Sequence, residues 1–175
     1  MRSLATFTCA AAALVSFACG STNNPSGPSG GSGTLNMRLT DSPFSDAKAV
    51  LVTFSEVSAH HEDSEWATIP FPADPSGAAV LERTCDLKKL NGPVDILGGG
   101  LLTAGHYTQI RLMVKSATIY FDTATDPAAP ACTAVAPTLA GAKANLTIPS
   151  GEVKLNRGFD LAADGTTTID RKSVV

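Results

Sequence analysis

The stretch "YTQIRLMVKSATIYF", residues 107–121, decides the fold because it carries the strongest strand pattern in the chain. Ile110, Leu112 and Val114 are apolar and point one way, while the polar side chains of Gln109 and Arg111 point the other way. This period of two is typical of a β-strand that buries one face and exposes the other. The same kind of pattern recurs on both sides of it, with little sign of helical periodicity. The sequence therefore predicts an all-β protein.

The predicted strands are short and separated by turn residues, which favours an antiparallel β-sandwich of Greek-key type, immunoglobulin-like or transthyretin-like. Residues 91–107 contain so many glycines that we expect a long connection there rather than a strand. About eight strands are expected, at residues 34–40, 48–60, 66–71, 79–90, 107–121, 144–149, 151–162 and 165–170, and the segment 79–90 is either a strand throughout or a strand followed by a short helical turn.

Two local features refine this prediction. In residues 48–60 the alternation shifts after Phe54, so that Val57 and Ala59 stay on the apolar face, and a β-bulge near Glu56 would produce that shift. The second is a turn just before Tyr107.

"LTAGHY", residues 102–107, places a small turn ending in Gly105 just before Tyr107 at the start of a strand. This pattern is similar to the tyrosine corner of Greek-key sandwiches, in which the phenol bonds back to nearby backbone. The alternative is a tyrosine that merely flanks a turn. Gly105 and Tyr107 are thus candidates for a structural corner.

The N-terminus has the character of an export signal. Arg2 precedes an uncharged apolar run of 15 residues, from Leu4 to Ala18. That run is shorter than the roughly 20 residues that a membrane-spanning helix needs. A charged start, a short apolar segment and a small-residue end predict a signal peptide at residues 1–18.

"SFAC", ending at Cys19, resembles the lipobox of bacterial lipoproteins, in which the cysteine thiol is acylated and becomes the mature N-terminus. Ordinary secretory cleavage after Ala18 is the alternative, because Ser16 and Ala18 also form a small-x-small site. If Cys19 is the lipid attachment site, Gly20 after it favours the outer membrane over the inner membrane, since retention in enteric-type sorting uses Asp at that position.

Residues 19–33 are predicted to tether the folded domain. Gly20–Gly33 has no aliphatic or aromatic side chain, so it cannot offset the entropy of ordering it. As a flexible coil it would span about 20 Å root-mean-square and at most about 50 Å. The folded domain is then expected at residues 34–175, which is 142 residues and enough for one core.

The net charge of the chain argues against a nucleic-acid-binding function. Removal of the signal leaves 12 Lys and Arg residues, because Arg2 is lost from the 13, against 16 Asp and Glu residues, for a net charge of −4. A mildly acidic domain without a basic cluster is unsuited to nucleic-acid binding.

Cys85 and Cys132 are the two cysteines left after the signal and the lipid site are set aside. In an exported domain they most simply form one disulfide, worth about 4 kcal/mol in the chain-entropy treatment of the loop it closes. A pair of free buried thiols is the alternative.

"HHEDSE", residues 60–65, is the only dense cluster of metal-ligand side chains. On an extended chain His60 and Glu62 point the same way, which makes them the candidates for a metal site. The alternative is a solvated hairpin tip. The sequence shows no nucleophile elbow, phosphate-binding loop or zincin helix, so we expect no catalysis and no cofactor.

Three stretches together resemble a known family: residues 33–60, "LLTAGHYTQIRLMV" at 101–114, and 148–170. They are similar to a bacterial lipoprotein domain of unknown function, number four-three-eight-two. The resemblance implies a lipoprotein signal and a low-complexity tether before the domain, and it assigns no catalytic residues. Family members usually continue past "TTTID" with a closing strand, which implies that this chain lacks its final strand or is truncated.

The expected function is that of a lipid-anchored envelope protein whose sandwich is a binding or structural module. Its partners would be the membrane, through the N-terminal acyl chains, and a polysaccharide or an envelope protein. Two alternatives stay open: a secreted or periplasmic enzyme or enzyme-accessory domain that uses the loop from His60 to Glu65, and a truncated, non-functional family member.

Overall fold

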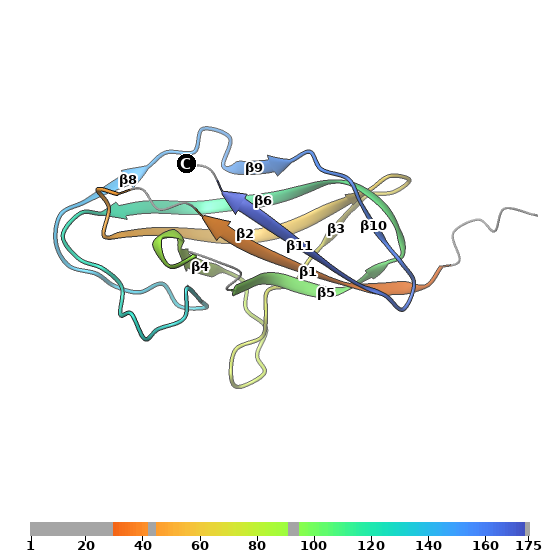
Figure 1. Cartoon of the computed structure of the whole chain (residues 1–175), viewed down its shortest axis with the longest axis horizontal. Helices are drawn as coiled ribbons and strands as arrows, with labels where there is room; N and C mark the ends of the chain where they lie inside the picture. The colour runs from red at the N-terminus through yellow and green to blue at the C-terminus, as the bar shows by residue number, and fades with distance from the viewer. Residues whose placement is uncertain (1–29, 42–44, 91–94, 174–175) are drawn as a thin grey trace, which may run out of the picture.

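The computed structural model describes residues 30–41, 45–90 and 95–173, and these residues form two β-sheets packed into a sandwich (Figure 1). The strands are β1 (Ser32–Asp41), β2 (Ala49–His61), β3 (Trp66–Thr68), β4 (Arg83–Asp86), β5 (Asp95–Thr103), β6 (Gly105–Tyr120), β7 (Cys132–Thr133), β8 (Lys143–Leu146), β9 (Glu152–Leu155), β10 (Phe159–Leu161) and β11 (Thr166–Ser173). A short 3-10 turn, η1 (Leu87–Lys89), follows β4.

The smaller sheet has the order β11-β1-β5 and the larger one the order β10-β6-β2-β4-β7. In the larger sheet β3 also pairs with β2, and β8 and β9 pair with β6. Every pairing is antiparallel except that of β1 with β11, which is parallel. The all-β sandwich is confirmed, although the described residues form eleven strands rather than about eight.

Alternation along the strands places one face of each sheet in a shared core. In β1, Leu35, Met37 and Leu39 are buried, while the residues between them are partly exposed. In β6, Ile110 and Leu112 meet them from the other sheet as members of the same core cluster. Full burial of each such side chain contributes about 1.5–3 kcal/mol, so the period of two supplies much of the stability.

The predicted bulge in β2 is confirmed. The pairing register of β2 with β6 shifts between Phe54 and Glu56, which leaves Ser55 without a partner. Because of this extra residue, Val57 and Ala59 remain on the buried face.

The prediction of a connection without regular structure at residues 91–107 is wrong, because β5 lies within it and pairs with β1. Its glycines are needed for close packing: the segment at Ile69–Phe71 lies directly against them. A Cβ on Gly100 would be 2.9 Å from Pro70 Cγ, and one on Gly98 would be 3.2 Å from Ile69 Cγ2. The amide of Gly99 also donates to the Pro70 carbonyl at 3.0 Å.

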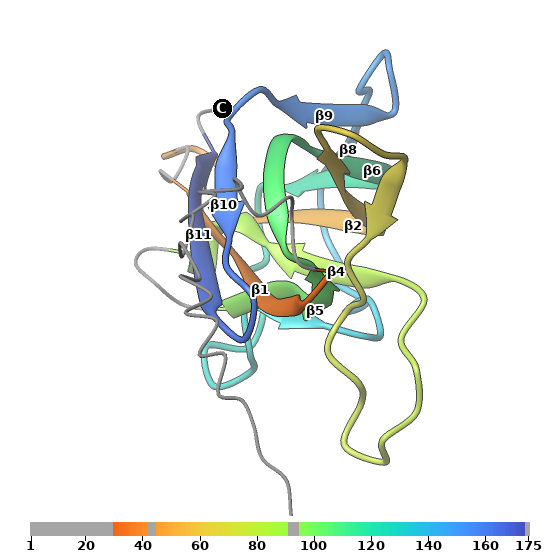
Figure 2. The same ribbon diagram turned by 90° about the vertical axis from the view of Figure 1, so that its right-hand side faces the viewer.

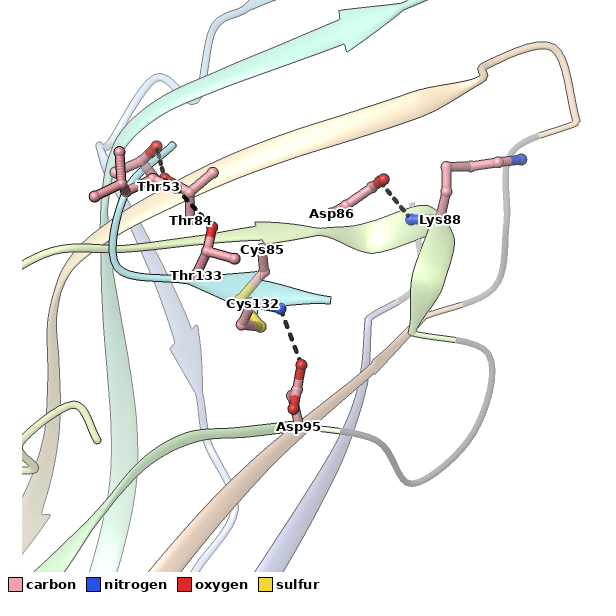
Figure 3. The surroundings of a disulfide bond; sticks show 9 residues. Thr53, Thr84, Cys85, Asp86, Lys88, Asp95, Cys132 and Thr133 are labelled. Carbon is pink, nitrogen blue, oxygen red and sulfur yellow. Dashed lines mark hydrogen bonds between the residues drawn. A yellow bond between two sulfur atoms is a disulfide. The ribbon is translucent and has the colours of Figure 1, made fainter. Parts of the chain in front are cut away.

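A disulfide joins Cys85 of β4 to Cys132 of β7, where the two residues are also paired in register (Figure 3). The Cys132 amide donates to Asp95 Oδ2 at 2.9 Å, which connects this edge of the larger sheet to β5 of the smaller one. The bond therefore ties the chain between β6 and β8 to the body of the sandwich.

Asp86 provides a second attachment for the same loop. Its side chain is buried, and it accepts hydrogen bonds from the Val50 amide, the Lys88 amide and the Thr125 hydroxyl. A buried carboxylate with three donors is fully compensated for the loss of water. This carboxylate has a structural role.

The glycine packing gives a first prediction. Gly100→Val should lower the free energy of unfolding by about 1–3 kcal/mol, because the new side chain would collide with the rigid Pro70 ring. Urea denaturation followed by tryptophan fluorescence measures it. Gly30→Val is the matched control, since a Cβ there has nothing within 4 Å, and it should leave the midpoint unchanged. Equal stability of both variants would contradict the close packing of β5.

Candidate functional site

The chain passes from the smaller sheet to the larger one at a sharp corner, where only Ala104 separates β5 from β6. The Tyr107 hydroxyl crosses this corner and donates to the Thr103 carbonyl at 2.8 Å. Tyr107 itself is 1% exposed, and burial raises the pKa of its phenol, so the hydroxyl stays a donor. This is the contact that the tyrosine-corner interpretation of Gly105 and Tyr107 requires.

Gly105 has a φ of +152°, a conformation that side-chain-bearing residues rarely adopt. A Cβ on it would lie 2.2 Å from His61 Nε2. The His61 ring in turn packs edge-on against Tyr107, with centroids 5.1 Å apart. Absence of a side chain at Gly105 thus lets the end of β2 close on the corner.

The corner brings together all three histidines of the chain. His60 Nδ1 is 3.1 Å from the Thr108 hydroxyl, and its ring packs edge-on against Trp66. His61 Nδ1 accepts from the Asp63 amide at 3.3 Å, so its neutral form carries the proton on Nε2, which is buried without a partner.

His106 is paired across strands with Asp160 of β10, with Nδ1 and Oδ1 2.7 Å apart. This hydrogen bond is the main reason why the pKa of His106 lies above its ordinary value; the charges of Asp160 and Glu62 act in the same direction, and desolvation opposes them. The pair therefore joins β10 to the corner most firmly when the imidazole is protonated.

The predicted metal candidates do not form a ligand cluster. His60 is partly buried beside Trp66, whereas Glu62 is exposed and uses its amide to donate to the His106 carbonyl at 2.9 Å. Across the described ranges, no group of three or more His, Cys, Asp or Glu side chains is arranged to hold a metal ion. The structure does bring "HHEDSE" and "LTAGHY" together at the corner, through the Glu62 amide on the His106 carbonyl and the His61 ring on Tyr107.

Trp66 lies on the outer face of the larger sheet under a charged side chain. The Arg111 guanidinium is 4.4 Å from the Trp66 ring centroid and 3.2 Å from Glu56 Oε1. These contacts cover one face of the ring and hold β2, β3 and β6 together from outside.

A groove of about 640 Å³ opens beside the corner, between the segment from Lys154 to Phe159 and strand β11. Figure 2 shows β10 and β11 next to each other at this side of the molecule, with β9 above them. Its lining mixes apolar, neutral polar, basic and acidic residues: Ile110, Lys154, Leu155, Asn156, Arg157, Gly158, Phe159, Thr167, Thr168, Ile169 and Asp170.

The groove wall rests on the corner. The Phe159 ring stacks on the Tyr107 ring, with centroids 5.0 Å apart and planes 5° from parallel. The next residue, Asp160, forms the pair with His106. The groove and the corner are therefore one structural unit, and we treat them together as the candidate functional site.

A second hollow, of about 560 Å³, lies near the disulfide, but several of its polar groups are engaged in holding the loop. Lys89 Nζ donates to the carbonyls of Asp126 and Ala129, and the Asp86 carboxylate accepts from the Thr125 hydroxyl. It is a less suitable ligand site for that reason.

The fold and the groove define a class, an all-β sandwich domain with an open cleft along one edge. Within that class the chain belongs to the family described as Domain of unknown function (DUF4382), which matches residues 32–170. No curated protein and no solved structure matches the chain. Cys19 and the predicted signal lie outside the described residues, among which no helix combines the length and apolarity needed to cross a membrane.

The tyrosine corner gives a second prediction. Tyr107→Phe removes the hydrogen bond to the Thr103 carbonyl and should lower the free energy of unfolding by about 1 kcal/mol. Tyr120→Phe is the matched control, because the hydroxyl of Tyr120 makes no hydrogen bond with the described residues. Equal urea midpoints for the two variants would mean that the corner bond contributes nothing.

The histidine pair gives a third prediction. Titration by NMR should place the pKa of His106 above about 6.5, and Asp160→Asn should bring it back toward that value. Because the pKa is raised in the folded state, the pair stabilises the protein fully below the unfolded-state pKa, and this contribution is lost as the pH rises through the folded-state pKa. A His106 titration that is unchanged by Asp160→Asn would show that the two side chains do not interact in solution.

Proposed function

We propose that this protein is a lipid-anchored cell-envelope protein whose β-sandwich is a binding module, with the groove as its ligand site. The groove is the observation that carries the binding part of the proposal: it is open to solvent, has several apolar lining residues and includes the exposed cationic side chains of Lys154 and Arg157. Pockets with apolar walls and a few polar groups are the usual place for ligands.

The composition of the groove favours binding over catalysis. Its described lining has one carboxylate, from Asp170, and two threonine hydroxyls, but none of the three histidines. Of the titratable groups that general acid–base chemistry could use there, Lys154 is already paired with Glu152 at 2.9 Å, which leaves the Asp170 carboxylate without a second group to work with. The lining residues are instead suited to holding a ligand by hydrogen bonds and charge.

The anchoring part of the proposal rests on the sequence. The apolar run of residues 4–18, Cys19 and the Gly/Ser/Pro tract form the order expected of an exported lipoprotein. Several acyl chains at one terminus hold a protein on a bilayer, whereas a single chain is marginal. The outer membrane is the favoured location because Gly20 follows Cys19.

An anchor at Cys19 would give the domain a direction relative to the membrane. The described chain begins next to the corner, where the Gly31 carbonyl accepts from the Ala104 amide at 2.7 Å. A tether attached there would turn the corner end toward the membrane and the disulfide end away from it. Four residues of β11 line the groove, and Figure 1 shows β11 running along the sandwich away from the corner end, so the groove would remain accessible.

Intact mass of the full chain purified from bacterial membranes tests the anchor. We expect cleavage after Ala18, added acyl mass on Cys19 and the loss of two hydrogens to the disulfide. Cys19→Ser should move the protein out of the membrane fraction. Cys9→Ser is the matched control, because that cysteine leaves with the signal, and it should change nothing. Wild-type protein found in the soluble fraction with a free Cys19 thiol would contradict lipid anchoring.

A further inference from the structure

We propose that the groove binds an extended peptide segment, which adds as a strand to the free edge of β11 and places an acidic side chain against Arg157. This inference rests on the proposed use of the groove as the ligand site and names the class of its ligand. The starting observation is the position of β11, which ends the order β11-β1-β5 and pairs only with β1 among the described strands.

The groove follows the edge of β11 rather than one of its faces. Thr167, Thr168, Ile169 and Asp170 are consecutive, and all four line it. Since successive side chains of a strand point to opposite faces, a hollow over one face would be lined by alternate residues only. Because every one of these residues of β11 lines the groove, the groove lies at the edge of the strand, on the side to which its free backbone N–H and C=O groups point.

The ladder between β1 and β11 identifies which backbone groups are free. Thr34 is in register with Thr166, and the Thr34 amide donates to the Gly165 carbonyl at 2.8 Å. In a parallel ladder, a residue whose amide points at the neighbouring strand bonds to the two residues that flank its partner. Every second residue of each strand is therefore bonded to the other strand. Thr167 and Ile169 thus bond to β1, while the backbone groups of Thr168 and Asp170 face the groove.

The opposite wall restricts what can enter. Asn156, Arg157 and Gly158 lie between β9 and β10 and belong to no strand, so the groove is bounded on both sides by the chain. An extended strand offers backbone groups at a repeat of about 6.7 Å, the same repeat as the free groups of β11. Strand addition to a sheet edge is an established way of recognising peptides. A single segment fits between two walls more readily than the edge of a second sandwich.

The charged side chains of the groove determine which side chain of a bound peptide is preferred. Arg157 is exposed at the groove and makes no ion pair with the described residues, whereas Lys154 is already 2.9 Å from Glu152. Asp170 adds one negative charge at the same site. The free guanidinium is therefore the group available to bind a carboxylate, for which its planar fork is well matched.

The test uses the full-length protein in detergent and an eight-residue fluorescent peptide in which valine alternates with threonine and glutamate. We expect saturable binding by fluorescence anisotropy. The same peptide with lysine in place of glutamate should bind about tenfold more weakly, equivalent to about 1.4 kcal/mol. A version N-methylated along one edge of the backbone should not bind, because it cannot join the ladder.

Matched variants locate the binding site. Thr168→Pro removes an amide that faces the groove and should abolish binding, because proline is tolerated at an edge but cannot donate. Thr166→Pro makes the same change two residues earlier, outside the groove lining, and should bind as the wild type does. Arg157→Gln should weaken binding of the glutamate peptide about tenfold without affecting the lysine peptide.

Four results would overturn the proposal: no saturable binding of either peptide, equal binding of the N-methylated peptide, full binding by Thr168→Pro at unchanged thermal stability, or a dimer in detergent that Thr168→Pro dissociates. The last would assign the edge to a second copy of the chain. A lipidated, membrane-bound protein that fails these binding tests keeps its place in the envelope and loses only the peptide ligand.

Discussion

The pairing of β6 along both of its edges is the constraint on which the rest of the structure depends. One edge pairs with β2 for nearly its whole length, and the other pairs with β10, β9 and β8 in turn. Because β6 has partners along both edges, it fixes the position of four other strands. Its first residues also form the corner through which the chain enters from the smaller sheet.

The candidate site follows from that position. Tyr107 uses its hydroxyl to close the corner and its ring face to support Phe159, so one side chain sets both the crossing between sheets and the wall of the groove. His106 adds a titratable contact to the same wall through Asp160. A ligand in the groove would therefore contact a strand, β11, on one side and a segment held by the corner on the other.

Much of the fold could be predicted from the sequence because alternation reports burial directly. The alternation at Leu35, Met37 and Leu39, and the shift beyond Phe54, gave the right strands and the right bulge. β5 could not be predicted, because three consecutive glycines such as Gly98–Gly100 are typical of a loop. The reason for glycine in this strand is that Pro70 packs against it, and only the structure shows that contact. The groove was also missed, since it forms between residues 154–159 and 167–170, and no local pattern reports contact between two distant segments.

Hydrogen exchange along β11 tests most directly whether this edge is open. The amides of Thr167 and Ile169 bond to β1 and should exchange slowly, while those of Thr168 and Asp170 face the groove and should exchange quickly. NMR on the full chain without added peptide resolves the four signals. Alternating protection is the expected result. Uniform slow exchange of all four amides would show that another segment already covers the edge, and the groove would then not be free to receive a strand.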